Sequence, residues 1–345
     1  MIPHSRPVFG AAFADAARRV VESGQLTSGP ECSALEAEVA GHIGIKHATA
    51  VDSGRSALLL ALYALKEDGD IRRVGIPAYA CRAILHAVRI AGMSPVCMDC
   101  SDDLRLDAAY AREIADGLDA VILAHPFGMI EPMVKESWPC PVIEDIAQSA
   151  GGRVGDQVSG QMLGGFGDVS VTSFYATKPW GGAYGGMVMS SNANICARVS
   201  QMRCADTADV TLPYAGNHQL SDIHATLARI RISKAAEERE SRMRLAKAYD
   251  AWFSRLKARP VVRENSCNHY RYIVRVTDAS HVIKALHAHG VGAVRPVNTP
   301  ISRLTGQYCP GAEAAWKQCV SLPLLTDMSR DELNCMEQAV VACMC

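Results

Sequence analysis

Apolar positions along the chain follow two patterns, helical spacing and short continuous runs, and the two alternate over most of its length. Near the beginning, Phe9 and Phe13 follow the helical period and predict an amphipathic helix over residues 8–23. A second helix is expected over Cys32–Ile43, and the apolar run His47–Val51 predicts a strand. Two helices therefore precede the first predicted strand.

Beyond this strand the alternation becomes regular. The predicted order is strand Val74–Pro77, helix Arg82–Ala91, strand Pro95–Met98, helix Ala108–Gly117, strand Ala120–Ala124 and strand Val142–Glu144. Strands that alternate with helices of about ten residues are typical of a parallel sheet covered by helices on both faces. The fold class is therefore predicted as α/β, and its ligands should collect beyond the carboxyl ends of the strands.

The last third of the chain has a different pattern. A long helical stretch over about Ser221–Arg255 becomes highly charged from Lys234 to Lys247. It is followed by a predicted strand at Tyr270–Val276 and helices at Ala279–Gly290 and Ser329–Val341. We therefore predict a large domain over residues 1–235 and a smaller α+β domain over residues 236–345.

Two residues that end apolar runs carry the first candidate chemistry. Asp145 closes the run that begins at Val142, and Lys178 follows the run that ends at Phe174 and opens into glycines. Such a pair can serve a pyridoxal phosphate enzyme, because the amine forms a Schiff base and the carboxylate keeps the pyridine nitrogen protonated. Taken alone, the pair fits an ordinary helix cap and a solvated loop lysine better.

A third segment, Asp52-Ser-Gly-Arg-Ser56, leads from the first strand into a strongly apolar helix. Gly54 lets the backbone approach a ligand closely, and the free N–H groups of the first helical turn can bind a phosphate. The alternative is a serine cap on a buried helix. The segment, Asp145 and the predicted strand end at His125 all lie at carboxyl ends of strands, which favours one shared site.

Composition narrows the class of protein. The formal net charge is -1 and charges of one sign form no block, so neither nucleic acid nor a membrane surface is an expected partner. No apolar run reaches about 18 residues, and the first residues lack the pattern of a signal peptide. The thirteen cysteines are dispersed and predict reduced thiols in a cytoplasmic protein. The eleven histidines show no metal-ligand spacing, and no metal is predicted.

Together these segments resemble the DegT/DnrJ/EryC1/StrS family of sugar aminotransferases, which are pyridoxal phosphate enzymes of fold type I. The likeness depends on the order and spacing of Ser23–Pro30, Asp52–Leu58, Ile76–Tyr79, Glu144–Gln148, Gly167–Lys178, Asn217–Asp222 and Ser321–Leu325. It implies a large domain with a mixed, mostly parallel sheet covered by helices, and a smaller C-terminal domain.

The resemblance assigns the catalytic roles. Lys178 would form the internal aldimine with pyridoxal 5'-phosphate and carry a proton between the donor and the cofactor. Asp145 would pair with the pyridine nitrogen, and Gln148 would lie beside the cofactor's hydroxyl. Cys81 stands where most relatives stack an aromatic ring on the cofactor, unless Tyr79 takes that place.

The resemblance also assigns the phosphate contacts. Gly54 and Arg55 would donate backbone N–H groups, and Ser173 its hydroxyl. The guanidinium of Arg55 either adds charge at the phosphate or points to solvent. Asn217 would reach the phosphate from the neighbouring subunit, which implies a homodimer with shared active sites.

Several positions depart from the family pattern on the substrate side. Tyr184 replaces an acid in the glycine run, Gln219 replaces an arginine, and Arg295-Pro-Val-Asn298 replaces a His/Tyr pair. His125 either contacts the substrate or is a capped loop histidine, whereas Glu144 should point away from Asp145 in a regular strand.

We therefore expect an aminotransferase that moves an amino group from an amino acid, with L-glutamate expected, to a keto group of a nucleotide-linked deoxysugar by ping-pong chemistry. Lys178 argues against the branch of the family that has histidine there and performs deoxygenation, because histidine cannot form the aldimine. One alternative is the same chemistry on a cyclitol or another non-nucleotide ketone. The other is a regulatory protein that binds pyridoxal phosphate without turnover.

Overall fold

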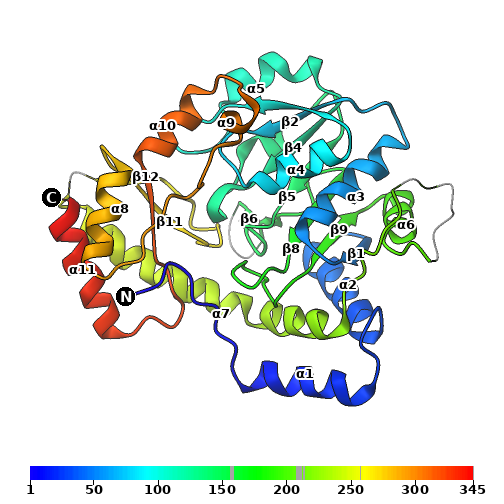
Figure 1. The fold of residues 1–345 in the computed structure, drawn as a ribbon, viewed down its shortest axis with the longest axis horizontal. Helices are drawn as coiled ribbons and strands as arrows, with labels where there is room; N and C mark the ends of the chain where they lie inside the picture. The colour runs from blue at the N-terminus through cyan, green and yellow to red at the C-terminus, as the bar shows by residue number, and fades with distance from the viewer. Residues whose placement is uncertain (156–158, 207–211, 213, 257, 345) are drawn as a thin grey trace.

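A seven-stranded sheet forms the centre of the larger part of the molecule (Figure 1). The computed structural model describes residues 1–155, 159–206, 212, 214–256 and 258–344. The strands lie in the order β1-β9-β8-β5-β4-β2-β3. Their bounds are β1 His47–Val51, β2 Arg73–Pro77, β3 Ser94–Met98, β4 Ala120–Ala124, β5 Val142–Asp145, β8 Val169–Ser173 and β9 Gly186–Ser190. Only β9 runs against the others, so the predicted mostly parallel sheet is confirmed.

Helices cover both faces of this sheet (Figure 1). Successive side chains of a strand point to opposite faces, and Val188 of β9 packs with the helices of one face while Met187 and Met189 pack with those of the other. The first face carries α3 (Gly54–Lys66), α4 (Arg82–Ile90) and α6 (Ala193–Met202). The second carries α2 (Pro30–Ile43) and the beginning of α7 (Asp222–Phe253), against which α1 (Ala11–Ser23) packs.

The smaller part is built on a three-stranded antiparallel sheet. It contains β10 (Arg259–Pro260), β11 (Tyr272–Arg275) and β12 (Cys319–Leu322), with helices α8 (Ala279–Ala288), α9 (Ile301–Thr305), α10 (Pro310–Gln318) and α11 (Arg330–Met344). The 32-residue helix α7 contributes Ala225 and Ala228 to the core of the larger part and Tyr249 and Phe253 to that of the smaller part. The predicted boundary at residue 235 lies inside this continuous helix, and the division into two domains stays a prediction.

The first residues of the chain cross to the smaller part, and the N-terminus lies near α8 and α11 in Figure 1. Ile2 is buried in the core of the smaller part and forms a bridge with Val291. Its N–H donates to Gly290 O at 2.7 Å, and Gly292 N–H donates to Ile2 O at 2.8 Å. The N-terminal segment is therefore a structural component of the C-terminal core.

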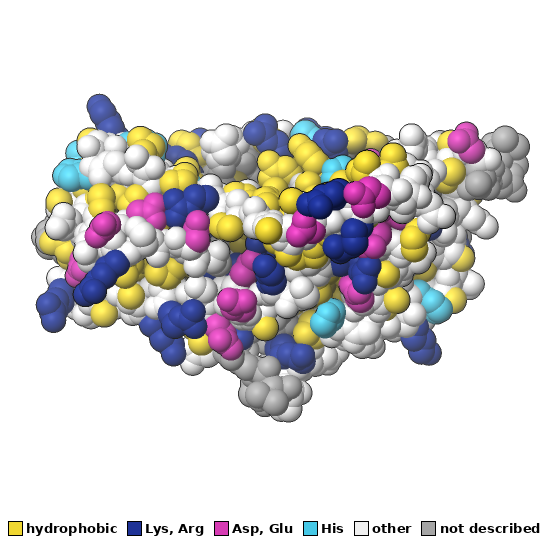
Figure 2. All heavy atoms as spheres, turned by 90° about the horizontal axis from the view of Figure 1, so that it is seen from below, with side chains coloured by type: hydrophobic (Ala, Val, Ile, Leu, Met, Phe, Trp, Pro, Cys, Tyr) yellow, Lys and Arg dark blue, Asp and Glu magenta, His cyan; other side chains and the backbone are white. Residues whose placement is uncertain are grey.

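Short elements complete the connections. They are α5 (Ala108–Ile114), the 3-10 turns η1 (Ala115–Gly117), η2 (Pro126–Gly128) and η3 (Pro132–Lys135), and the hairpin of β6 (Arg153–Val154) with β7 (Gln161–Met162). The first helix begins at Ala11 rather than at residue 8, directly after Gly10. Figure 2 shows acidic and basic side chains interspersed over the lower face. In the described ranges, no helix is both long and apolar enough to span a bilayer.

Candidate active site

The N-terminus of α3 meets the carboxyl end of β8. Ser53 caps the helix, since its Oγ accepts the Ser56 N–H at 3.1 Å. The Gly54 and Arg55 N–H groups belong to the first turn and have no intrahelical acceptor. A Cβ on Gly54 would lie 2.7 Å from the Cβ of Ser173, so only glycine allows this approach. Two free N–H groups and a serine hydroxyl thus gather at one point, which suits a phosphate.

Asp145 is the last residue of β5 and borders the same cavity as this helix end. Its Oδ1 accepts the Ala147 N–H at 2.9 Å. Burial raises the pKa of the Asp145 carboxyl above its ordinary value, although the Ala147 N–H and the charge of Lys178 oppose this shift. A carboxylate in this situation is stabilised by a cationic N–H partner, and a protonated pyridine nitrogen is such a partner.

Lys178 lies in a tight turn between β8 and β9. Its N–H donates to Tyr175 O at 2.8 Å, and the Gly181 N–H donates to Lys178 O at 2.8 Å. A Cβ on Gly181 would collide with Tyr175 O, so the turn depends on glycine. The Nζ lies 5.7 Å from the ring centroid of Tyr270, and no described carboxylate lies within 4 Å of it. The amine is therefore held by its backbone and not by an ion pair.

Two hydrogen bonds hold Gln148 in place and leave its amide nitrogen available to a ligand. Its Oε1 accepts the Phe127 N–H at 3.0 Å, and its main-chain oxygen accepts from Asn268 Nδ2 at 3.0 Å. The Nε2 group is the part of the side chain left to donate to a ligand. This matches the role beside a cofactor hydroxyl that the resemblance implies.

One cavity of about 300 Å³ joins these groups. The predicted residues that border it are Gly54, Arg55, Cys81, Asp145, Gln148, Ser173 and Lys178. Asn217 is exposed and does not border it. A phosphate cradle, a carboxylate and a free amine around one space fit pyridoxal phosphate. In the described part of the chain, no cluster of three His, Cys, Asp or Glu side chains suits a metal ion.

Comparison with known proteins agrees with this geometry. Residues 8–341 match the model of the DegT/DnrJ/EryC1/StrS aminotransferase family. The chain belongs to this family. It is accordingly an aminotransferase, and aminotransferases of the family use pyridoxal phosphate.

Individual relatives cover nearly the whole chain. A UDP-N-acetyl-3-dehydro-alpha-D-glucosamine 3-aminotransferase from Acidithiobacillus ferrooxidans is 27% identical in an alignment of 335 positions that covers 91% of this chain and 89% of that protein. Helicobacter pylori PseC, an aminotransferase involved in the biosynthesis of pseudoaminic acid, superposes with a TM-score of 0.90 at 20% identity, covering 99% and 98% of the two chains. DesI, solved in the presence of its TDP-sugar product, gives a TM-score of 0.87 at 24% identity, covering 99% and 92%. The fold type I architecture is thereby shown.

The three positions that depart from the DegT/DnrJ/EryC1/StrS pattern on the substrate side differ in whether they border the cavity. Tyr184 borders the cavity and packs edge-on against Tyr175, with ring centroids 5.5 Å apart. Gln219 does not border it, because its amide bonds to Ser28 and Cys204. Arg295, another of the departures on the substrate side, does not border the cavity either.

Arg295 is engaged within the smaller part of the molecule. Its guanidinium stacks 3.9 Å from the ring centroid of Trp316 and donates to Ser280 Oγ at 2.5 Å. Cys81 is exposed at the cavity, whereas Tyr79 is buried and its hydroxyl reaches Ala315 O at 3.5 Å. Both residues border the cavity, and which of them lies against the cofactor ring stays a prediction.

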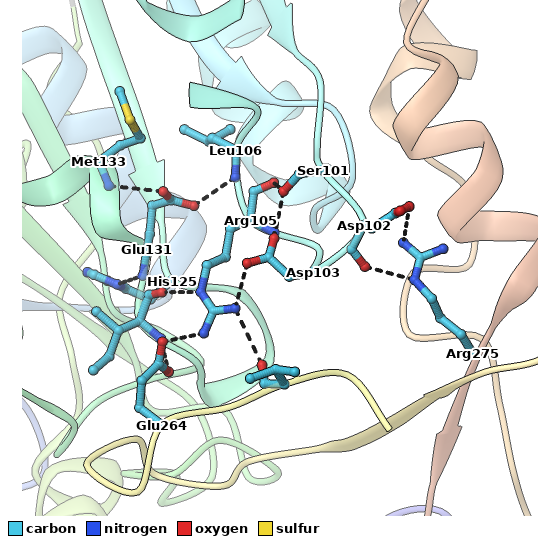
Figure 3. Close-up of polar contacts among 12 residues, drawn as sticks. Ser101, Asp102, Asp103, Arg105, Leu106, His125, Glu131, Met133, Glu264 and Arg275 are labelled. Carbon is cyan, nitrogen blue, oxygen red and sulfur yellow. Dashed lines mark hydrogen bonds and ion pairs between the residues drawn. The ribbon is translucent and has the colours of Figure 1, made fainter. Parts of the chain in front are cut away.

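The cavity wall contains a buried polar network that the sequence pattern does not predict (Figure 3). Arg105, which is 5% exposed, donates its Nε–H to Ile130 O at 2.7 Å and pairs with Asp103 and Glu264. The carboxylate of Glu131, which is 1% exposed, accepts the Leu106 N–H at 2.9 Å. Charged residues at these positions follow no apolar period, and no sequence signal indicated their burial.

His125 belongs to this network. Its Nδ1 accepts the Glu131 N–H at 2.9 Å, and its Nε2 lies 3.1 Å from Glu144 Oε1. The structure therefore favours the capped loop histidine, because neither ring nitrogen is free to bind substrate, although His125 borders the cavity. Glu144 does not border the cavity, as strand alternation predicts.

Proposed function

We propose that this aminotransferase uses pyridoxal 5'-phosphate to move an amino group from an amino acid, with L-glutamate as the expected donor, to the keto group of a nucleotide-linked deoxysugar. One observation carries the proposal: Lys178, Asp145 and the first turn of α3 border a single cavity. The UDP-sugar 3-aminotransferase relative and the DesI structure with its TDP-sugar product support the acceptor class.

Bound in this cavity, pyridoxal phosphate supplies an electron sink for the carbanion that forms when the donor loses its Cα proton. With the cofactor bound, Lys178 Nζ would accept this proton from the donor and return it on the other side of the transfer. Its lack of a carboxylate partner leaves the amine available for release and recapture in each half of a ping-pong cycle. Asp145 accepts the N–H of the pyridine nitrogen and keeps it protonated.

The remaining residues position the cofactor. The N–H groups of Gly54 and Arg55 and the hydroxyl of Ser173 hold the phosphate, where the end of α3 favours negative charge. The Nε2 group of Gln148 donates to the cofactor's hydroxyl oxygen. Cys81, which borders the cavity, would give the cofactor ring a smaller contact than an aromatic ring gives.

We propose further that the enzyme is a cytoplasmic homodimer whose subunits share their sites. Asn217 is exposed and does not border the cavity of its own chain, which supports a role toward a second copy. Mixing inactive Lys178→Ala and Asn217→Ala proteins tests this arrangement. If the sites are shared, each hybrid dimer has one fully intact site and therefore about half the activity of a wild-type dimer. Random reassembly makes about half of the dimers hybrid, so the mixture should regain about a quarter of wild-type activity.

A second acceptor class, a non-nucleotide ketone such as a cyclitol, is favoured by one observation. The inner wall of the cavity is apolar, with Leu104, Leu106 and Phe127, and its buried cation Arg105 is already paired with carboxylates. A diphosphate therefore finds no unpaired buried arginine along this wall.

Two measurements test the proposed function. The purified protein should take up pyridoxal phosphate and turn yellow, lose this absorbance with L-glutamate, and regain it with a nucleotide-linked keto-sugar. A panel of keto-sugars and keto-cyclitols separates the two acceptor classes. A protein that stays colourless with pyridoxal phosphate contradicts the proposal, as does a holoenzyme that no amino acid converts.

A further inference from the structure

Two cysteine thiols meet at the edge of the central sheet. Cys97 belongs to β3, the last strand in the sheet order, and Cys309 is the residue before α10. Their side chains hydrogen-bond to each other, and both residues are buried in the same core cluster. The spacing Cys97-Met-Asp-Cys100 alone would suggest a pair within that motif, but the folded chain gives Cys97 the partner Cys309.

Hydrogen bonds on either side hold the two segments together. The side chain of Gln307, in the loop between α9 and α10, lies against β3, and its Oε1 accepts the Cys97 N–H at 2.8 Å. The carboxylate of Asp99 accepts the N–H groups of Gly311 and Ala312, each at 2.8 Å. The two thiols are therefore brought together by bonds in which no sulfur atom takes part.

The surroundings of Cys97 favour its thiolate. Thr305 Oγ1 lies 3.3 Å from Cys97 Sγ. The hydrogen bond from Cys309, together with that from Thr305, lowers the pKa of the Cys97 thiol below its ordinary value, although burial opposes the shift. The same hydrogen bond and burial raise the pKa of Cys309, which keeps its proton. Because the thiolate is the reactive form of cysteine, Cys97 is the thiol that an oxidant attacks.

The partner thiol follows an exposed loop. Cys309 is 5% exposed, but its neighbour Tyr308 is 88% exposed, and Pro310 is exposed as well. A local opening of this loop admits a molecule as small as hydrogen peroxide while the strands of the sheet stay paired. Burial therefore slows the reaction of the pair without preventing it.

We propose that Cys97 and Cys309 form a peroxide-sensitive thiol pair that closes into a disulfide and ties the α9–α10 loop to β3. The Cys97 thiolate attacks one oxygen of hydrogen peroxide, so that an S–O bond forms, the O–O bond breaks and hydroxide leaves. The Cys309 sulfur then attacks Cys97 Sγ, and its proton leaves with the hydroxyl group as water while the S–S bond forms. The two thiols lose two electrons, and the peroxide is reduced to two molecules of water.

The bond changes stability and part of the cavity wall. A disulfide between segments that are distant in the sequence stabilises a protein by restricting its unfolded chain, so the oxidised protein melts at a higher temperature. From Cys97 the chain leads through Asp99 to Cys100, which borders the cavity, so the disulfide also fixes this corner of the wall. None of the groups assigned to the cofactor takes part, and the inference is independent of the proposed function.

Peroxide treatment followed by peptide mapping tests the pair without relying on turnover. The full-length protein is incubated with pyridoxal phosphate and hydrogen peroxide, its remaining thiols are alkylated, and its peptides are identified by mass spectrometry. A protease that cuts on the amino side of Asp99 separates Cys97 from Cys100. We expect peptides linked through Cys97 and Cys309, which dithiothreitol separates again. The inference is overturned if both thiols stay open to alkylation after the exposed Cys81 is oxidised, or if Cys97 is linked to Cys100 instead.

Thermal unfolding supplies a second readout with a matched control. Peroxide should raise the melting temperature of wild type and of Cys196→Ser by about 3 °C or more, and dithiothreitol should reverse the rise. Cys97→Ser and Cys309→Ser should show no reversible rise. Cys196 is the control, because it is also buried beside a threonine hydroxyl, that of Thr49. An equal reversible rise in all four proteins contradicts the pair, and the peptide map of wild type decides the matter where a serine variant does not fold.

Discussion

His125 donates its Nε2–H to Oε1 of Glu144 across 3.1 Å, with both side chains fully enclosed. The proton lies on Nε2 because Nδ1 accepts the Glu131 N–H. Glu144 also accepts the N–H groups of Gly164 at 2.7 Å and Phe166 at 2.8 Å. Burial opposes its ionisation, but these hydrogen bonds outweigh burial and hold the pKa of Glu144 below its ordinary value.

Glu144→Gln should therefore destabilise the protein by about 2 to 4 kcal/mol, because an amide NH₂ then faces groups that only donate. Urea unfolding of wild type and variant measures the difference. Glu136→Gln is the control, since its exposed pair with Arg112 should contribute less than about 1 kcal/mol. Equal effects of the two substitutions would contradict the role given to Glu144.

Gly54→Ala should weaken pyridoxal phosphate binding by about tenfold and, because the methyl overpacks against Ser173, should lower the unfolding free energy by about 1 to 3 kcal/mol. The added methyl would lie 2.7 Å from the Cβ of Ser173 and would push the first turn of α3 away from the phosphate. Titration of the cofactor-free protein gives the dissociation constant. Gly41→Ala in α2 is the matched control, because its methyl meets nothing within 4 Å and should raise stability by about 0.5 to 1 kcal/mol. The same cofactor affinity in Gly54→Ala as in wild type would disprove the cradle.

Asp145→Asn should stabilise the cofactor-free protein and disable the holoenzyme. The raised pKa means that the native state binds the Asp145 proton more tightly than the unfolded state does. The stabilisation from the protonated acid is present below the ordinary carboxyl pKa of about 4 and is lost as pH rises through the raised value.

The melting temperature of cofactor-free Asp145→Asn should therefore exceed that of wild type at pH 8, and the difference should disappear near pH 4. The rate of the holoenzyme with donor should fall by about 100-fold or more, since the pyridine nitrogen loses its partner. Asp116→Asn, at an exposed position of η1, is the control and should change neither quantity. A pH-independent difference in melting temperature would refute the role of the Asp145 proton.

Arg105→Met should cost about 2 to 3 kcal/mol of unfolding free energy and raise the KM for the acceptor. The substitution removes the hydrogen bond to Ile130 O at 2.7 Å and frees the Asp103–Leu106 segment, whose last three residues border the cavity. Urea unfolding and steady-state kinetics check the two effects. The control Arg112→Met removes an exposed ion pair. It should leave the unfolding free energy and the KM for the acceptor unchanged within error. If the KM for the acceptor changes equally in both variants, the position of the Asp103–Leu106 segment at the cavity does not depend on Arg105.

The cofactor end of the site could be predicted because its residues sit at ends of regular elements. Asp145 and Ser173 each end an apolar strand, and Gly54 follows one, so parallel strands bring them to one edge of the sheet. Lys178 follows β8 by a short glycine-stabilised turn. These relationships depend on local pattern and sheet topology, which the sequence expresses directly.

The substrate end could not be predicted, because its geometry depends on distant partners. Arg105 is buried because Ile130 and Glu264 accept its hydrogen bonds, and Arg295 is drawn away from the cavity by Trp316. No periodicity encodes such pairings.

The N-terminal segment described above affects how this protein is made. His4 bonds Ser321 across 317 positions of sequence, and Ile2 fills a core that also needs α11. During synthesis from the N-terminus, Ile2 and its neighbours stay without their final partners until almost the whole chain has left the ribosome. The core of the smaller part is therefore completed last, and this part of the enzyme should be the final one to mature.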